Sequence, residues 1–227
     1  TLGGKMINIE NVRVNVGGLG HFTNTYIVYD DVEKEGIIVD PGYEANKIIS
    51  KIVELGISIK YIVLTHAHGD HTGALKEVYE YTKGKVLIHE NDYDMLIGKV
   101  EDYSIAQGIK RKDLSSCNIT KVKDNFCFRV GILNFEIIHT PGHTAGGICL
   151  FEKTSNCLFT GDTIFYDCYG RCDLATANFE EMVNSIQKIF DRFDDIIIYP
   201  GHGRATNLSK AKKYIRILLK MKNIKIN

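Results

Sequence analysis

Histidine and aspartate are concentrated in one short segment of the chain, which reads THAHGDH over residues 65–71. Its candidate ligands fall within six consecutive positions and are His66, His68, Asp70 and His71. A tight loop that leaves a strand turns alternate side chains inward, and Gly69 permits the bend. His66 and His68 can therefore converge, and Asp70 and His71 then lie where the next helix begins. Imidazole and carboxylate groups suit zinc, iron or manganese, and ligand type alone does not choose among these metals.

Three further loops carry histidine or aspartate beside glycine, each directly after an apolar run typical of a buried strand. They read TPGHT, GDT and PGHG, and their candidate ligands are His143, Asp162 and His202. A solvated histidine-rich turn, or a purification tag, would not be accompanied by such residues at three other strand ends. The pattern therefore predicts a shared metal site at one edge of a core.

The segments between these loops show the periods of strands and helices. Strands are predicted over Ile7–Val14, Asn24–Tyr29, Gly36–Val39, Tyr61–Leu64, Lys85–His89, Phe126–Val130, Leu133–Ile138, Gly147–Glu152, Cys157–Thr160 and Ile196–Tyr199. Helices are predicted over Ala45–Leu55, Thr72–Tyr81, Phe179–Phe190 and Leu208–Met221. Each half is rich in strands and ends with helices, which predicts helices covering two packed sheets. Asn91–Lys112 has no clear period and is interpreted as a partly helical, lid-like segment.

The composition is that of an ordinary globular protein. The chain has 227 residues, of which 44% are hydrophobic and 25% charged. Its 28 basic and 28 acidic residues cancel, so no long-range attraction favours nucleic acid. No apolar run approaches the roughly 18 residues of a membrane span. We therefore expect a small-molecule substrate, with neither nucleic acid nor a membrane as partner.

The start of the chain and its cysteines bear on processing and compartment. Thr1–Lys5 is interpreted as an expression scar ahead of Met6, and residues 6–227 as a single domain. Six cysteines are present without a recognisable secretory segment, and a chain of this length does not need disulfides. We expect reduced thiols and a cytoplasmic protein.

Taken together and in this order, the motifs resemble those of the metallo-β-lactamase superfamily from Met6 to about Leu219. The resemblance rests on VDPG at 39–42, HAHGDH, TPGHT, GDT and PGHG. It implies an α/β fold of αββα layers, a sandwich of two mixed sheets flanked by helices, with metals at the edge between the sheets. It also implies two divalent metal ions, with zinc favoured and iron or manganese as alternatives.

The resemblance divides the candidate ligands between two metal ions. Three imidazoles would hold the first ion, those of His66, His68 and His143. A carboxylate and two imidazoles would hold the second, those of Asp70, His71 and His202. Asp162 would bridge both ions, and Asp40 would orient a ligand from behind, as such sites usually require.

Within the superfamily, the greatest likeness is to hydroxyacylglutathione hydrolases (glyoxalase II) and their short stand-alone relatives. Those relatives carry a GRTD motif after the bridging aspartate, and Cys172 replaces its usual threonine here. Zinc β-lactamases of the commonest type have Cys where Asp162 stands and lack His at position 71. Flavin-linked di-iron members carry Glu where His68 stands. Neither pattern fits this chain.

The function implied is hydrolysis of a thioester by a hydroxide that bridges two metal ions. Full-length glyoxalase II has a C-terminal helical domain that binds glutathione, whereas only 25 residues follow His202 here, so the thiol carrier stays open. The GRTD motif also occurs in persulfide dioxygenases, which hold a single iron, and this is the alternative function. Lactone hydrolysis is a weaker alternative, because the same hydroxide serves any activated ester.

Several residues are assigned roles around the metals. Asp70 is predicted to orient the hydroxide. Arg171 is predicted to bind a substrate carboxylate, with a salt bridge to Asp173 as the alternative. Tyr166 is predicted to line the pocket. His21 is predicted to lie in a solvated turn. Cys168 and Cys172 are predicted to be small buried side chains rather than a redox pair. The acyl group and the oligomeric state are not specified by the sequence.

Overall fold

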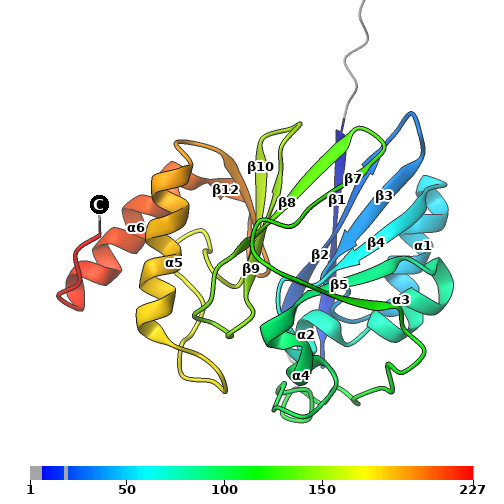
Figure 1. The fold of residues 1–227 in the computed structure, drawn as a ribbon, viewed down its shortest axis with the longest axis horizontal. Coiled ribbons are helices and arrows are strands. Elements are labelled where there is room, and N and C mark those ends of the chain that lie inside the picture. The colour runs from blue at the N-terminus through cyan, green and yellow to red at the C-terminus, as the bar shows by residue number, and fades with distance from the viewer. Residues whose placement is uncertain (1–6, 18–19, 227) are drawn as a thin grey trace, which may run out of the picture.

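The computed structural model describes residues 7–17 and 20–226, and the predicted expression scar at Thr1–Lys5 lies outside them. Two six-stranded sheets pack face to face, and helices cover the outer face of each sheet (Figure 1). The predicted αββα sandwich is confirmed. Among the described helices, none is long and apolar enough to cross a membrane.

The first sheet is built from the first half of the chain. Its strands follow chain order and are β1 (Ile7–Val16), β2 (His21–Asp30), β3 (Glu35–Val39), β4 (Ser58–Val63), β5 (Lys85–His89) and β6 (Ile119–Val122). The first three pair antiparallel, and β3 to β6 pair in parallel. Helices α1 (Ala45–Leu55) and α3 (Leu75–Thr82) serve as crossovers and cover the outer face.

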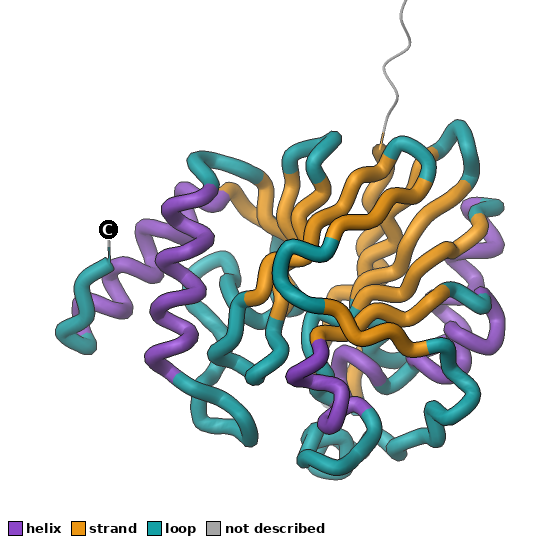
Figure 2. The backbone as a smooth tube through the Cα atoms, in the orientation of Figure 1, coloured by secondary structure: helices purple, strands orange, loops and turns teal. Residues whose placement is uncertain are grey.

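The second sheet is built from the second half of the chain. Figure 2 shows the strands of both sheets gathered between the helices. The strands of the second sheet are β7 (Cys127–Val130), β8 (Leu133–His139), β9 (Ile148–Glu152), β10 (Cys157–Gly161), β11 (Ile197–Pro200) and β12 (Thr206–Asn207). Only β10 and β11 pair in parallel; the other neighbours are antiparallel. Helices α5 (Phe179–Arg192) and α6 (Leu208–Met221) cover its outer face.

Central strands of both sheets are buried on both faces, which explains their continuous apolar runs. In β4, Ile62 packs toward the helices of the first half, whereas Val63 packs between the sheets. In β10, Leu158 packs toward α5 and α6, whereas Phe159 packs between the sheets. The alternation along each strand therefore divides the apolar side chains into three stacked core layers.

Most predicted elements are present, and the bounds predicted for α1, β5 and α6 agree with the structure to the residue. The helix predicted over Thr72–Tyr81 is present as α3, but it begins at Leu75 instead of Thr72. The chain forms α2 (Gly69–Thr72), breaks, and begins again as α3. Between the two helices the chain packs against the loop after β3, where Ala74 N donates to Pro41 O at 3.0 Å. A Cβ on Gly73 would lie 2.5 Å from Gly42 O, so only glycine fits there.

The segment interpreted as a partly helical lid is helical only at its start. A 3₁₀ turn, η1 (Glu90–Asp92), leads into the single turn α4 (Tyr93–Leu96), and turns follow to residue 112. The strands β6 and β12 were not predicted. Both are short and lie at sheet edges, where pairing partners rather than the local pattern decide strand formation.

Candidate metal centre

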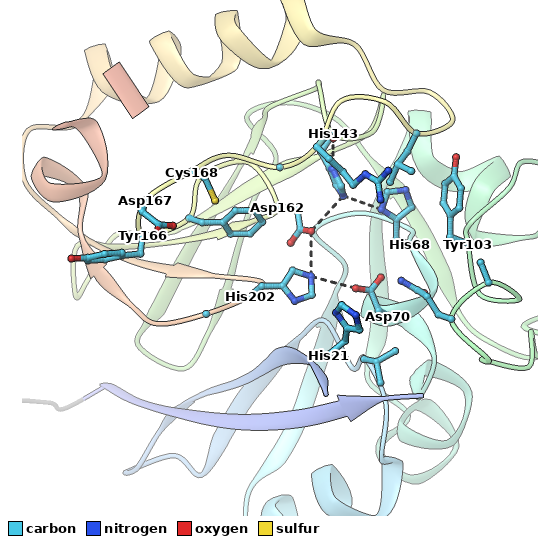
Figure 3. Close-up of a pocket in the computed structure, with 18 residues that line it drawn as sticks. His21, His68, Asp70, Tyr103, His143, Asp162, Tyr166, Asp167, Cys168 and His202 are labelled. Atoms are coloured by element: carbon cyan, nitrogen blue, oxygen red, sulfur yellow. Dashed lines mark hydrogen bonds and ion pairs between the residues drawn. The ribbon is translucent and has the colours of Figure 1, made fainter. Parts of the chain in front are cut away.

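The seven candidate ligands meet at one edge of the sandwich, where the carboxyl ends of four strands lie together. The loop after β4 carries four of them, and the loops after β8, β10 and β11 carry one each. Figure 3 shows five of these side chains turned toward one another, those of His68, Asp70, His143, Asp162 and His202. The structure therefore brings together residues that lie up to 136 positions apart, from His66 to His202.

The first group consists of His66, His68 and His143, whose ligand atoms lie within 4.8 Å of one another. His143 Nδ1 lies 2.8 Å from Arg171 O and donates to it, so its Nε2 carries a lone pair. That Nε2 faces His68 Nδ1 at 2.9 Å. Nε2 of His66 is buried and has no hydrogen-bond partner among the described residues. His66, His68 and His143 thus bring three ring nitrogens close enough together to hold one cation.

The second group consists of Asp70, His71 and His202, again with ligand atoms within 4.8 Å of one another. His71 Nδ1 pairs with Asp40 Oδ2 at 2.8 Å, and His202 Nδ1 donates to Phe22 O at 2.7 Å. Both Nε2 atoms therefore face the centre, and they lie only 3.2 Å apart. Lone pairs held this close repel each other unless a proton or a cation lies between them, so the donor set fits a metal ion.

Asp162 lies between the two groups. Its Oδ1 is 3.4 Å from His71 Nε2, and its Oδ2 is 3.4 Å from His143 Nε2 and 3.3 Å from His202 Nε2. The backbone comes close to this carboxylate, because a Cβ on Gly201 would lie 2.4 Å from Asp162 Oδ1. One carboxylate that contacts imidazoles of both groups has the placement of a bridging ligand.

Burial controls the protonation of the first group. It lowers the pKa of His66 and lowers that of His68 to about 3, and the neighbouring imidazoles act in the same direction. Both rings are therefore neutral at pH 7. A neutral imidazole is the form that binds a metal.

Carboxylates control the protonation of the second group. Burial alone would lower the pKa of His71 and His202, but Asp162 and Asp70 raise both, that of His202 to about 12. Burial would likewise raise the pKa of Asp70 and Asp162, yet the adjacent imidazoles hold both well below the usual range. The second group therefore concentrates negative charge that attracts protons or metal ions.

A cavity of about 710 Å³ opens onto the centre (Figure 3). Five of the seven candidate ligands form its floor, namely His68, Asp70, His143, Asp162 and His202. Its walls come from both halves of the chain and are formed by Val16, His21, Tyr103, Ala106, Gln107, Phe165, Tyr166, Asp167, Cys168, Gly170, Arg171, Leu174 and Gly203. A small organic substrate can reach the metal ligands through this space.

A family model for the metallo-beta-lactamase superfamily matches residues 18–226. The chain belongs to the metallo-beta-lactamase superfamily. Hydroxyacylglutathione hydrolase GloC of Haemophilus influenzae is 33% identical over 192 residues, which cover 84% of this chain and 90% of that protein. The chain is a metal-dependent hydrolase of this superfamily, and its buried His and Asp groups fit a binuclear metal centre.

Two solved structures are similar to this chain over nearly its whole length. The BLEG-1 B3 metallo-beta-lactamase has a TM-score of 0.81 at 25% identity, and the match covers 93% of this chain and 99% of that one. TTHA1623, solved in a di-iron-bound form, has a TM-score of 0.78 at 25% identity and covers 92% and 99% of the two chains. The described fold is thus the fold of these two proteins.

Asp40 lies behind the centre. Its Oδ1 accepts from Thr65 N at 2.7 Å, and its Oδ2 accepts from Thr65 Oγ1 at 2.6 Å and pairs with His71 Nδ1 at 2.8 Å. Both oxygens are therefore occupied by protein donors. Asp40 also lies close enough to His66 and His71 to count as a ligand, but this bonding favours the orienting role that the sequence suggests.

Sequence reasoning missed Asp92, a buried carboxylate that ties two ligand loops together. Its Oδ2 accepts from Ala67 N at 3.0 Å and from Thr144 Oγ1 at 2.8 Å, and its Oδ1 accepts from Gly146 N at 2.6 Å. Ala67 lies between two candidate ligands, and Thr144 follows a third. The signal was available, because Asp92 also follows the carboxyl end of a central strand, β5.

The residues predicted around the substrate have different placements. Arg171 lines the cavity, but its guanidinium makes two 2.8 Å bonds to Asp173, and both side chains are more than 60% exposed. Tyr166 also lines the cavity. His21, assigned to a solvated turn, is exposed and lies on the cavity wall.

The six cysteines, all among the described residues, are unpaired. Cys168 lines the cavity, whereas Cys172 packs against the core beneath α5 and α6. Burial raises the pKa of both thiols to about 11, so neither is a thiolate at neutral pH. These observations agree with the interpretation of both as small apolar side chains.

Proposed function

We propose that this protein hydrolyses a thioester of a small carboxylic acid, using two divalent cations held by the two ligand groups. The observation that carries the proposal is the complete set of seven ligands, with Asp162 between the groups, at the floor of a cavity. The similarity to a hydroxyacylglutathione hydrolase supports a thioester as the substrate. Zinc remains our first expectation for the cations, and the di-iron form of TTHA1623 makes iron the second.

Two cations at such a centre supply hydroxide at neutral pH and polarise the carbonyl of the substrate. The protein's own contribution is to hold seven donor atoms in place and to keep the first group's imidazoles neutral. Asp70 lies on the cavity floor with its Oδ2 3.3 Å from His202 Nε2, where its carboxylate can orient a nucleophilic water. A thioester suits this arrangement, because a thiol of pKa about 8.5 leaves with little protonation.

Arg171 and Tyr166 are proposed to bind the substrate at the cavity wall. The ion pair of Arg171 with Asp173 is exposed on both sides, and such pairs contribute little free energy. The guanidinium can therefore exchange Asp173 for a carboxylate of the substrate at small cost. Its planar pair of donors matches a carboxylate well.

The first test is metal content by plasma mass spectrometry on protein purified without a tag or chelator. Hydrolysis of a 2-hydroxyacyl glutathione thioester is followed in parallel by release of the free thiol. We expect about two zinc or iron ions per chain and thiol release that a chelator abolishes. A single iron per chain without thiol release would overturn the proposal in favour of the persulfide dioxygenase.

A ligand variant with a matched control localises the activity. His68→Ala removes one imidazole of the first group, so we expect loss of about one metal ion per chain and of hydrolysis, with the fold retained. His21→Ala removes an imidazole from the cavity wall that belongs to neither ligand group, and it is expected to keep both ions. A metal-depleted His68→Ala protein that still hydrolyses the thioester would contradict the proposed role of the centre.

A further inference from the structure

One side of the cavity is formed by a strap, defined here as residues 102–109. Its beginning is fixed to the ligand loop, because Gly69 N donates to Asp102 O at 2.8 Å. The Asp102 carboxylate is in turn held by Arg111 at 2.7 Å. Its end is fixed by Ile109, which is 3% exposed and whose N donates to Ser104 O at 2.8 Å. The strap is therefore anchored at both ends, with Tyr103, Ala106 and Gln107 facing the cavity.

Tyr103 connects the strap to the opposite half of the molecule. Its phenol oxygen accepts from Ala175 N at 2.6 Å, and Ala175 lies beside the cavity-lining Leu174 of the second half. Its ring lies 5.4 Å from the His68 ring, in an edge-to-face arrangement at 78°. The Tyr103 side chain thus lies next to the first ligand group, and its hydrogen bond from Ala175 N joins the two halves of the molecule.

The backbone of Tyr103 is strained. Its φ is +60°, a left-handed conformation that an aromatic residue rarely adopts. Such strain persists only where the surroundings hold the residue, and it is concentrated at functional positions. Here the anchors at Asp102 and Ile109 hold it, so the ring is fixed in the cavity rather than free to turn away.

The two ends of the cavity differ. Figure 3 shows Tyr103 and Tyr166 on opposite sides of the ligand cluster. At the Tyr166 end, the half-buried tyrosine lies beneath the guanidinium of the exposed Arg204, which is 3.7 Å from the ring centroid. That end offers a cation and a path to solvent, which suit a large polar thiol carrier. At the other end the Tyr103 side chain limits the length of the cavity, which suits the smaller acyl group.

We propose that Tyr103 sets the size of the acyl group by closing the cavity beside the first ligand group. The inference rests on the proposed function for the identity of the occupant, an acyl group bound through its carboxyl carbon. The substrates are then thioesters of short acids, whose acyl chain extends no farther than the phenol ring of Tyr103. The ring forms the limit, and the bond from Ala175 N keeps the ring in place.

The test measures binding of the acid product rather than turnover. Linear carboxylates from acetate to octanoate are titrated by calorimetry into the metal-loaded protein. In the wild type we expect affinity to rise by about fourfold per buried methylene and then to fall once the chain reaches Tyr103. In Tyr103→Asn, which keeps a left-handed backbone accessible, the rise should continue, with octanoate gaining about tenfold or more over wild type.

Three further variants complete the test. Tyr103→Gly also favours positive φ and serves if Tyr103→Asn does not fold. Tyr103→Phe retains the ring and should retain the wild-type chain-length limit. Ile105→Ala changes an 82% exposed residue of the strap that does not line the cavity, and it should bind every acid as the wild type does.

The outcome separates this inference from the proposed function. Identical chain-length profiles for wild type and Tyr103→Asn would overturn the role of Tyr103, as would a wild type that binds none of the acids. Hydrolysis of thioesters by the wild type is measured separately. If the wild type shows the chain-length limit but releases no thiol from thioesters, the role of Tyr103 stands and the proposed function is overturned.

Discussion

The two ligand groups of the centre share Asp162 yet differ in charge. The first consists of three imidazoles, and burial lowers the pKa of His66 and His68. The second combines two imidazoles with the carboxylate of Asp70, and carboxylates raise the pKa of both imidazoles. Similar residue types are thus tuned in opposite directions by their neighbours. The imidazoles of His66 and His68 are ready for a cation at neutral pH, whereas His202 of the second group must first release a proton.

The largest expected effect comes from the residue that the two groups share. Asp162→Asn replaces a carboxylate that contacts imidazoles of both groups with a neutral amide, one end of which cannot bind a cation. We expect a loss of more than about 100-fold in thioester hydrolysis, because residues that merely orient ligands already cost 10- to 100-fold. Metal content should fall below two ions per chain.

Asp167→Asn is the matched control for that substitution. Asp167 lies five positions further along and lines the cavity, but it belongs to neither ligand group. Its variant is expected to retain both metal ions. Should Asp162→Asn keep two ions and the wild-type rate of hydrolysis, the two groups would be independent sites without a bridging ligand.

A smaller effect is expected from the two buried carboxylates that support the groups. Asp40 holds His71 of the second group, and Asp92 holds the loops of His66, His68 and His143. We expect Asp40→Asn to lower the metal affinity of the second group by about 10- to 100-fold. Asp92→Asn should lower the metal affinity of the first group by a similar factor. A two-step titration against a chelating dye measures both affinities, and His68→Ala identifies the step that belongs to the first group. Equal weakening of both steps by either variant would show that the centre responds as one unit.

The smallest expected effect is the pH dependence of metal binding by the second group. Before a cation binds, the pKa of His202 is raised to about 12, so its ring is protonated at neutral pH and the cation must displace the proton. Affinity of the second group should therefore fall as the pH falls from 8 to 6. The pKa of His68 is lowered to about 3, so the first group has no such proton to release in this range. Calorimetric titrations at both pH values, in buffers of different ionisation enthalpy, count the protons; equal release at both steps would remove the distinction between the groups.

Local patterns predicted much of the fold because they carry their own signals. Helix α1 shows clear apolar periodicity and ends at Gly56, whose φ is +62°, and strand β5 is a compact apolar run. The helix predicted over Thr72–Tyr81 has the same kind of pattern, yet it begins only at Leu75, because residues 73 and 74 pack against Pro41 and Gly42. Tertiary contacts of this kind are not visible in a window of local sequence, and propensity yields to them.

The candidate ligands were found from sequence because the chemistry of a metal centre restricts both residue type and position. Histidine and aspartate beside glycine at four strand ends form a pattern that few other structures require. Asp92 and Tyr103 belong to the same edge of the sandwich, but neither is a ligand. They act through hydrogen bonds to Gly146 N and Ala175 N, across 54 and 72 positions of chain.

The sequence by itself thus determined which side chains are available to bind cations and which strand ends present them. Tertiary structure alone decided which nitrogen of each ring faces the centre, since Arg171 O and Phe22 O select it for His143 and His202. It also decided the opposite pKa shifts of the two groups and the wall that limits the cavity. The physical reason is that electrostatics and packing depend on distances between atoms, and only the folded chain sets those distances across the two sheets.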